Sequence, residues 1–444
     1  MMFGVDRRKF LGWSGIATCS LLAPVTGFAA SLGGGRRRCV LVGAPGGASF
    51  LDSFMAIRDT GHSRYSRINA WHPSLMSLPV SRYPFTSVEC WAVAGGHTTY
   101  NLSAQTSLVT RFGREMVVAT QQARSLEHVE AQQQVLRGSV TGPSFMDEVG
   151  RTSSTPFGHI HLLEKKGGFQ LASDDTSSAG LNLLLTPSEI AALKDDPEIS
   201  ALGRALYDPR LSMRHRGEAL ARAGDLERIA KAFLLFWEEV PSGADPAEAA
   251  FAELGNRLLP DWANHPLMQQ ALVASMMIRY DLASALTLSP VVWGVERPHV
   301  GPEIRSAFDG SHRAHRATQA VLWSEISSVL LGLRVLLETC TTARGSLAAE
   351  TLLLVASEFG RSDVRPRGAA EWSSYHAADS AVLAIAPFLR GGRLLGDHPR
   401  RQARMGWDPA TGSALPGVVN TTTHVADSVL GALGMGPRYA RAFI

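Results

Sequence analysis

Short apolar runs that end in glycine-rich or polar loops occur in the first and last thirds of the chain. They predict strands at Arg38–Ala44, Val88–Ala94, Met116–Ala119, Thr351–Ala356 and Ala381–Ala386. Helical patterns lie between these runs, the longest over Ala314–Leu337, where apolar residues recur at helical spacing. Buried strands that alternate with helices are typical of an α/β fold with a mainly parallel sheet flanked by helices.

The middle of the chain has a different pattern. Residues 187–288 are rich in Ala, Leu, Glu and Arg at helical spacing, and Pro187-Ser188-Glu189 is a helix-start signal. We therefore expect a helical insertion or cap over residues 187–288. It would divide one α/β domain into an N-terminal part, 30–186, and a C-terminal part, 289–444.

The N-terminus has the pattern of an export signal. Arg7 and Arg8 precede a weakly apolar stretch, Gly12–Phe28, and the small residues Gly27 and Ala29 suit cleavage after Ala29. Paired arginines before such a stretch predict a twin-arginine signal peptide over residues 1–29. The partner during export would be the Tat translocase, and the mature protein would be periplasmic or extracellular. The alternative is an ordinary amphipathic N-terminal helix.

Composition narrows the class of protein. Hydrophobic residues make up 45% and charged residues 19% of the chain, as in proteins with a sizeable core. The net charge of +3 is too small for a nucleic-acid-binding surface, and no later run of apolar residues predicts a membrane span. The mature chain keeps Cys39, Cys90 and Cys340, which do not predict a disulfide scaffold, although two of them could pair in an oxidising compartment.

Polar residues that follow the predicted strands are the candidates for chemistry, because ligands of open α/β sheets bind beyond the carboxyl ends of strands. After the first strand, Ser49 and Asp52 follow a Gly-Gly turn and offer a hydroxyl and a carboxylate. After the second, Thr98 and Thr99 are candidate hydroxyl nucleophiles. Helix capping is the alternative at both places.

The C-terminal part adds acidic and imidazole groups. Asp309 and His312 are close enough in sequence to bind one divalent ion, unless Asp309 caps the next helix and His312 and His315 lie on its exposed face. Glu358 directly follows an apolar strand, where a carboxylate needs a cation or hydrogen-bond donors. Arg361 is one such partner, which would make the Glu358–Arg361 pair structural. His376 precedes the next strand, so it can return to the same edge of the sheet as Glu358.

Several of these segments together resemble a known family. They are the twin-arginine start, Gly46-Gly47-Ala48-Ser49-Phe50-Leu51-Asp52-Ser53-Phe54, Phe308-Asp309-Gly310-Ser311-His312, Ser357-Glu358-Phe359-Gly360-Arg361 and Gly391-Gly392-Arg393-Leu394-Leu395-Gly396, in this order. The chain resembles the exported domain-of-unknown-function family 1501, a relative of the alkaline phosphatase and sulfatase superfamily. The likeness covers the two ends of the mature chain and little of its helical middle.

The resemblance implies an alkaline-phosphatase-like sheet with a divalent-metal site (Zn, Mn, Mg or Ca) at the strand ends. By position, Asp309, His312 and His376 would bind one metal, Glu358 would take the place of a metal-binding aspartate, and Ser49 and Asp52 would make the N-terminal contact. Thr98 or Thr99 would be the nucleophile, and Arg361 would stabilise charge on the substrate. The expected substrate is a small anionic ester, a phosphate or a sulfate.

The chain also departs from the family pattern. Phe359 stands where many superfamily members have a histidine, and Tyr375 stands where the family has an aspartate. The Asp309–His312 segment is one residue longer than the usual Asp-Thr-His. Two functions are therefore carried forward: an exported metal-dependent hydrolase of phosphate or sulfate esters, and a non-catalytic binding or assembly protein that keeps the fold with a degenerate metal site.

Overall fold

The structure is a computed structural model. It describes residues 37–55, 91–92, 99–100, 103–137, 143–163, 169, 178–180, 189, 192–193, 195–206, 215, 220, 226–239, 265–290, 307–342, 345–362, 371–396, 405–435 and 441–444. Internal contacts divide the chain into Met1–Gly35 and Arg36–Ile444, and every element below belongs to the second unit. The expected signal peptide, 1–29, lies outside the described residues.

A central sheet organises the second unit. In the described part of the chain it has eight strands in the order β14-β4-β13-β10-β1-β7-β5-β6. The bounds are β1 Arg38–Gly43, β4 Met116–Gln122, β5 Phe157–His161, β6 Ser178–Gly180, β7 Ala283–Leu288, β10 Thr351–Ala356, β13 Asp379–Ile385 and β14 Arg393–Leu395. Neighbouring strands are parallel except where β13 pairs with β4 and β10. The predicted α/β fold with a mainly parallel sheet is confirmed.

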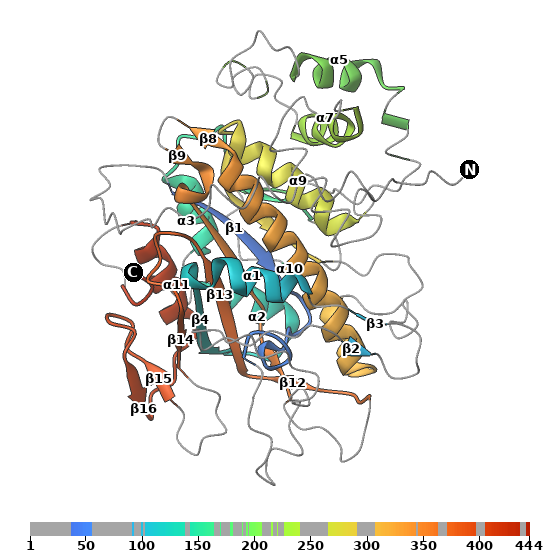
Figure 1. Cartoon of the computed structure of the whole chain (residues 1–444). Coiled ribbons are helices and arrows are strands. Elements are labelled where there is room, and N and C mark those ends of the chain that lie inside the picture. Colours follow the sequence, from blue (N-terminus) through green and yellow to red (C-terminus); the bar gives the residue numbers. More distant parts are fainter. Residues whose placement is uncertain are drawn as a thin grey trace, which may run out of the picture. The chain divides into compact units, whose positions relative to one another are not determined.

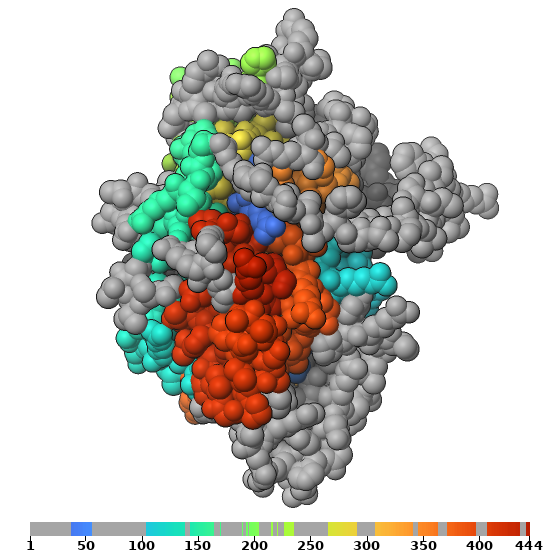
Figure 2. Space-filling view, turned by 90° about the vertical axis from the view of Figure 1, so that its left-hand side faces the viewer, coloured from blue at the N-terminus to red at the C-terminus, as the bar shows by residue number. Residues whose placement is uncertain are grey.

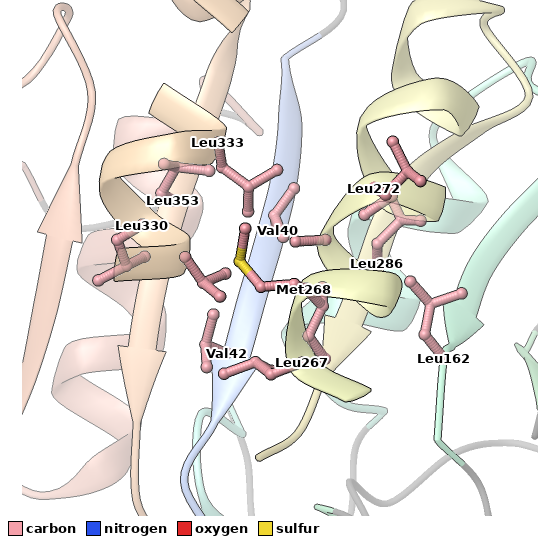
Figure 3. Packing of buried hydrophobic residues seen from close by; sticks show 14 of the residues in the cluster. Val40, Val42, Leu162, Leu267, Met268, Leu272, Leu286, Leu330, Leu333 and Leu353 are labelled. Carbon is pink, nitrogen blue, oxygen red and sulfur yellow. The ribbon is translucent and has the colours of Figure 1, made fainter. Parts of the chain in front are cut away.

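Helices cover both faces of this sheet (Figure 1). The first face packs against α1 (Ser103–Phe112), α9 (Pro266–Arg279) and α10 (His315–Thr339), and the second against α3 (Phe145–Arg151) and α11 (Thr422–Ala432). The side chains of β1 alternate between the two faces of the sheet: Val40 and Val42 pack with the first set of helices, and Cys39 and Leu41 with the second. Figure 3 shows side chains of α9 and α10, such as Met268 and Leu333, gathered over Val40 and Val42.

The long helix α10 forms much of the first core. By length and composition it is the one helix, among those the structure describes, that could cross a membrane. It is mostly buried inside the protein, where it packs on α1 and α9, and core helices commonly meet the same criteria. Its first turn lies next to the 3-10 turn η6 (Ala307–His312), which carries Asp309 and His312.

The segment 187–288 is only partly the helical insertion that the composition predicts. α5 (Pro197–Leu206) packs on α7 (Leu226–Glu239), and α7 packs on α9. However, α9 lines the core, and the end of the segment forms β7, an interior strand between β1 and β5. The small residues of β7, Ala283-Ser284-Ala285, gave no strong apolar run, so the sequence reading missed this strand.

Short two-stranded pairs complete the described structure. They are β2 (Trp91–Ala92) with β3 (Thr99–Tyr100), β8 (Thr341–Thr342) with β9 (Gly345–Ser346), β11 (Gly360–Arg361) with β12 (His376–Ala377), and β15 (Met405–Trp407) with β16 (Ala414–Pro416). The strand expected at Val88–Ala94 is therefore described only as β2, which pairs with β3 and not with the central sheet. Figure 2 shows the C-terminal elements (red) beside the blue-green part of the chain that includes α3.

Candidate metal centre

The candidate site lies where β1 and β10 end. The two strands are parallel neighbours, and the Ala44 N–H donates to the Ala356 carbonyl as both chains leave the sheet. The turn after β1 passes through Gly46 and Gly47, with φ angles of 96° and 81°. A Cβ on Gly46 would lie 2.5 Å from the Asp309 backbone nitrogen, so glycine permits this close approach to η6.

Glu358 is almost fully buried directly after β10, as its sequence position predicted, and its carboxylate is well supplied with donors. Oε1 accepts from the Gly46 N–H at 2.7 Å and from Gln132 Nε2 at 3.3 Å, and it lies 3.0 Å from His128 Nδ1. Oε2 accepts from the Ser357 hydroxyl at 3.2 Å. These donors offset the cost of burying the charge, and two of them come from α2 (His128–Gln134).

His128 joins Glu358 to Asp309. Its Nε2 lies 3.2 Å from Asp309 Oδ2, while its Nδ1 faces Glu358. Burial by itself lowers the pKa of His128, but the hydrogen bonds to Asp309 and Glu358 outweigh burial and raise the pKa to about 9. In the protein without a bound cation, His128 is therefore a protonated bridge between two carboxylates.

Asp309 is the centre of the cluster. Its Oδ1 accepts from Arg361 Nη2 at 2.9 Å and lies 3.6 Å from His376 Nε2 and 3.8 Å from His312 Nε2. Burial raises the pKa of Asp309, but the contacts with His128 and His376 and the charge of Arg361 more than reverse this and hold the pKa well below its usual range. Asp309 thus remains a carboxylate over the whole working pH range.

The two histidines of the C-terminal part face each other. His376 Nδ1 lies 3.0 Å from the Leu126 carbonyl, which can only accept, so Nδ1 carries a proton and Nε2 is the ring atom that faces the cluster. His312 Nε2 is 2.9 Å from His376 Nε2 and 3.0 Å from Arg361 Nη1. Burial and the nearby charges of Arg361 and His376 lower the pKa of His312 to about 4.

Arg361 is a buried cation that holds the loops together. Its guanidinium donates to the carbonyls of Gly46, Gly47, Phe308 and Ser374 as well as to Asp309. The side chain is fully buried, and burial lowers its pKa to about 10 although Asp309 opposes this change. Because its donors already face protein oxygens, the geometry does not favour the expected role of Arg361 in binding an anionic substrate. Its ion-pair partner is Asp309, not Glu358.

Three of these side chains can hold a divalent metal ion. His128, Asp309 and His376 each offer one ligand atom, and the three atoms lie within 4.8 Å of one another. Two imidazoles and one carboxylate suit Zn and the divalent first-row metals. The Leu126 carbonyl sets the His376 tautomer and Glu358 orients His128, which are the supports that metal-ligating histidines normally have. The donor set therefore fits the metal that the sequence implied.

The remaining predicted site residues lie elsewhere. Asp52 does not join the three-ligand group, because its Oδ2 lies 2.8 Å from Nε2 of the buried His315. The backbone of Ser49 is fixed by Gln319 and Trp323, and Ser49 is buried. Thr99 lies in β3, and Thr98 is outside the described residues. Asp309, His312 and His376 lie together, and Glu358 is linked to Asp309 through His128. Neither His312 nor Glu358 is among the three residues of the ligand group found in the described part of the chain.

Sequence reasoning missed His128 and Gln132. Both lie on α2, a seven-residue helix that follows β4, and no apolar run or glycine turn marks the place. The available signal was positional: β4 runs in the same direction as β10 and β1, so the residues that follow it return to the same edge. His315 was expected on an exposed helix face if Asp309 were a cap, but it is fully buried.

Comparison with known proteins adds no further constraint. No protein-family model matches the chain, and no curated protein matches it significantly. The resemblance to family 1501 therefore remains a prediction from the motifs, and any function proposed for the chain rests on the geometry of the site.

Proposed function

We propose that this protein is an exported, divalent-metal-dependent hydrolase of phosphate or sulfate esters. The observation that supports the proposal is the meeting of His128, Asp309 and His376 at the carboxyl edge of the sheet, with ligand atoms within 4.8 Å of one another. These residues come from three distant parts of the chain. A cation held there would supply positive charge to a substrate oxygen and acidify a hydroxyl or a water.

Neighbouring groups of the protein set the charge and the orientation of these three side chains. Asp309 stays ionised, and His376 directs Nε2 at the cluster because Nδ1 donates to the Leu126 carbonyl. Glu358 accepts from His128 and so fixes the orientation of that ring. His312, whose pKa is lowered to about 4, is neutral near pH 7 and so adds no positive charge beside His376.

Metal analysis tests the proposal. Protein purified without chelators should contain a stoichiometric divalent ion, and His376→Ala and His128→Ala should each lose it while keeping the fold. His215→Ala, an exposed histidine, is the control and should bind metal normally. A panel of phosphate and sulfate esters, assayed with added Zn, Mn, Mg or Ca, then tests for turnover that depends on the same two histidines. Wild-type protein without a stoichiometric ion under all these conditions would exclude the metal-dependent mechanism.

One observation favours the second candidate, a binding or assembly protein with a degenerate site. Arg361 and the protonated His128 already neutralise Asp309 and Glu358 within the protein. A cluster that balances its own charge is stable without a cation. Metal-free protein that folds normally and hydrolyses no ester would support this candidate over the enzyme.

A further inference from the structure

A second set of buried polar residues lies directly behind the metal centre. Asp52 Oδ2 is 2.8 Å from His315 Nε2, and His315 Nδ1 is 2.6 Å from the Ser374 hydroxyl. All three residues are less than 5% exposed. They come from the turn after β1, the start of α10 and the segment before β12, so one imidazole ring joins three distant segments.

Ser374 connects this chain of hydrogen bonds to the predicted ligands. Its N–H donates to the Ser311 carbonyl at 2.9 Å, and its hydroxyl lies 3.3 Å from the same oxygen. Its carbonyl accepts from Arg361 Nη1 at 3.2 Å. Ser311 directly precedes His312, and Ser374 stands two residues before His376. The position of Ser374 therefore fixes the distance between the two histidine-bearing segments.

His315 belongs to a polar stripe on one face of α10. His315, Gln319 and Trp323 are spaced by four residues and so lie on the same side of the helix. Gln319 accepts from the Ser49 N–H and donates to the Gly47 carbonyl and to the Ser311 hydroxyl, at 2.9–3.2 Å. Trp323 donates to the Ser49 carbonyl at 3.0 Å. This face of α10 therefore holds both the glycine turn and η6.

The segment that carries His376 is also docked on the first turn of α10. The His315 N–H donates to the Trp372 carbonyl at 2.8 Å, and the Trp372 ring stacks on the His315 ring with centroids 5.2 Å apart. Glu371 accepts from the N–H groups of Arg316 and Ala317. His315 is thus in contact with the His376 segment through its backbone, its ring face and its Nδ1.

We propose that His315, held by Asp52 and bonded to Ser374, is a positioning residue for the metal centre: it sets His376 opposite Asp309. The inference rests on the proposed metal function. Burial of the Ser374 hydroxyl argues against a nucleophile in a catalytic triad, because a nucleophile must reach the substrate. Asp52, expected as a metal ligand, acts through His315 instead.

The same protein contains a matched control. Asp147, His159 and Thr287 form another buried Asp–His–hydroxyl chain, with His159 Nδ1 2.7 Å from Asp147 Oδ1 and His159 Nε2 2.9 Å from the Thr287 hydroxyl. These residues lie on α3, β5 and β7, and none of them contacts His128, Asp309 or His376 through a hydrogen bond. Replacing His159 or His315 by leucine therefore removes two buried hydrogen bonds in each case; those of His315 reach the segment that carries His376, and those of His159 do not.

The decisive measurement is metal affinity. Zn binding to the full-length protein is measured by competition with a chromophoric chelator for wild type, His315→Leu, Ser374→Ala and His159→Leu. We expect His315→Leu to weaken Zn binding about 10–100-fold, the usual effect of removing an outer-shell partner, and Ser374→Ala to weaken it less. His159→Leu should leave the affinity unchanged. Equal affinities for His315→Leu and wild type, or an equal loss in His159→Leu, would overturn the proposal. If His315→Leu does not fold, the Zn affinity of Ser374→Ala is the test of the proposal.

A metal-free measurement separates this inference from the proposed function. In ¹⁵N-histidine-labelled protein, the His376 ring should report protonation at Nδ1, and His315→Leu or Ser374→Ala should shift its ring signals while His159→Leu does not. If the wild-type protein binds no metal, the proposed function is wrong, but the His376 signals of the variants can still be compared. Unchanged His376 signals in both variants would show that His315 does not position that ring.

Discussion

Gly46 is the residue whose missing side chain allows the β1 turn to approach Asp309. Gly46→Ala combines an unfavourable positive φ with a Cβ 2.5 Å from the Asp309 backbone nitrogen. Gly417→Ala is the matched control, because Gly417 has a φ of 78° but open space around its Cβ position. We expect Gly417→Ala to cost about 1–2 kcal/mol of unfolding free energy, and Gly46→Ala to cost about 1–3 kcal/mol more and to weaken metal binding. Chemical denaturation and chelator competition measure both quantities. Equal costs would contradict the close packing.

Arg361→Ala measures the loss of unfolding free energy when one partner of a buried ion pair is removed. Arg361→Ala leaves Asp309 Oδ1 and four backbone carbonyls without their donor, and loss of one partner of a buried pair costs about 3–5 kcal/mol. Arg111→Ala is the control, because its bond to Glu338 is exposed and such pairs contribute about 0–1 kcal/mol. Urea unfolding of both variants gives the comparison. A loss below that of Arg111→Ala would show that Arg361 does not hold the loops.

Individual residues of the site were predictable only where the sequence marks a strand end. Glu358 was identified because a carboxylate after an apolar strand needs donors, and the donors are present. His128 was not, because its place beside Asp309 and Glu358 depends on where a short helix after β4 packs. Asp52 was placed at the right turn, but its carboxylate lies against the buried ring of His315, which is 263 positions away in the sequence.

At the scale of elements, the start of α10 depends on a residue from another segment. The N-cap, Ala314, has no side chain that can accept, and Glu371 supplies both carboxylate oxygens to the amides of Arg316 and Ala317. Glu371→Ala should cost about 0.5–2 kcal/mol, as loss of a cap does, and should speed hydrogen exchange at those two amides. Thr421→Ala, which breaks the capping box of α11, should have a similar cost but affect only α11 amides. Unchanged exchange at Arg316 and Ala317 in Glu371→Ala would contradict this role.

Elements with strong apolar runs were predictable, and elements defined by their neighbours were not. β1, β10 and α10 were expected within a few residues of their observed bounds, because buried strands and long helices carry their own pattern. β7 has small residues that suit an interior position between two strands but do not mark a strand by themselves. The antiparallel direction of β13 depends on the connection from β10 through β11 and β12, which local sequence does not encode.

For the whole molecule, the pH dependence of stability follows from groups whose pKa differs between the folded and unfolded states. Burial, followed by the charge of His159, lowers the pKa of His161 to about 3, although Asp147 opposes this. In an unfolded chain the pKa of histidine is about 6.5. Between these values the unfolded state binds the extra proton, so His161 reduces the stability of the fold as pH falls from about 6.5 towards 3.

His161→Gln removes this proton uptake without adding charge, and the variant should lose less stability than wild type over that pH range. The difference in unfolding free energy between variant and wild type, measured by denaturant titration at successive pH values, isolates His161 from the carboxylates that both proteins share. His215→Gln is the control, because His215 is exposed, and it should follow the wild-type curve. Parallel curves for His161→Gln and wild type below pH 6.5 would mean that His161 is solvated and titrates normally in the folded protein. A smaller slope confined to His161→Gln would show instead that the end of β5 excludes a charged ring, so that protonation of His161 contributes to acid unfolding of the sheet.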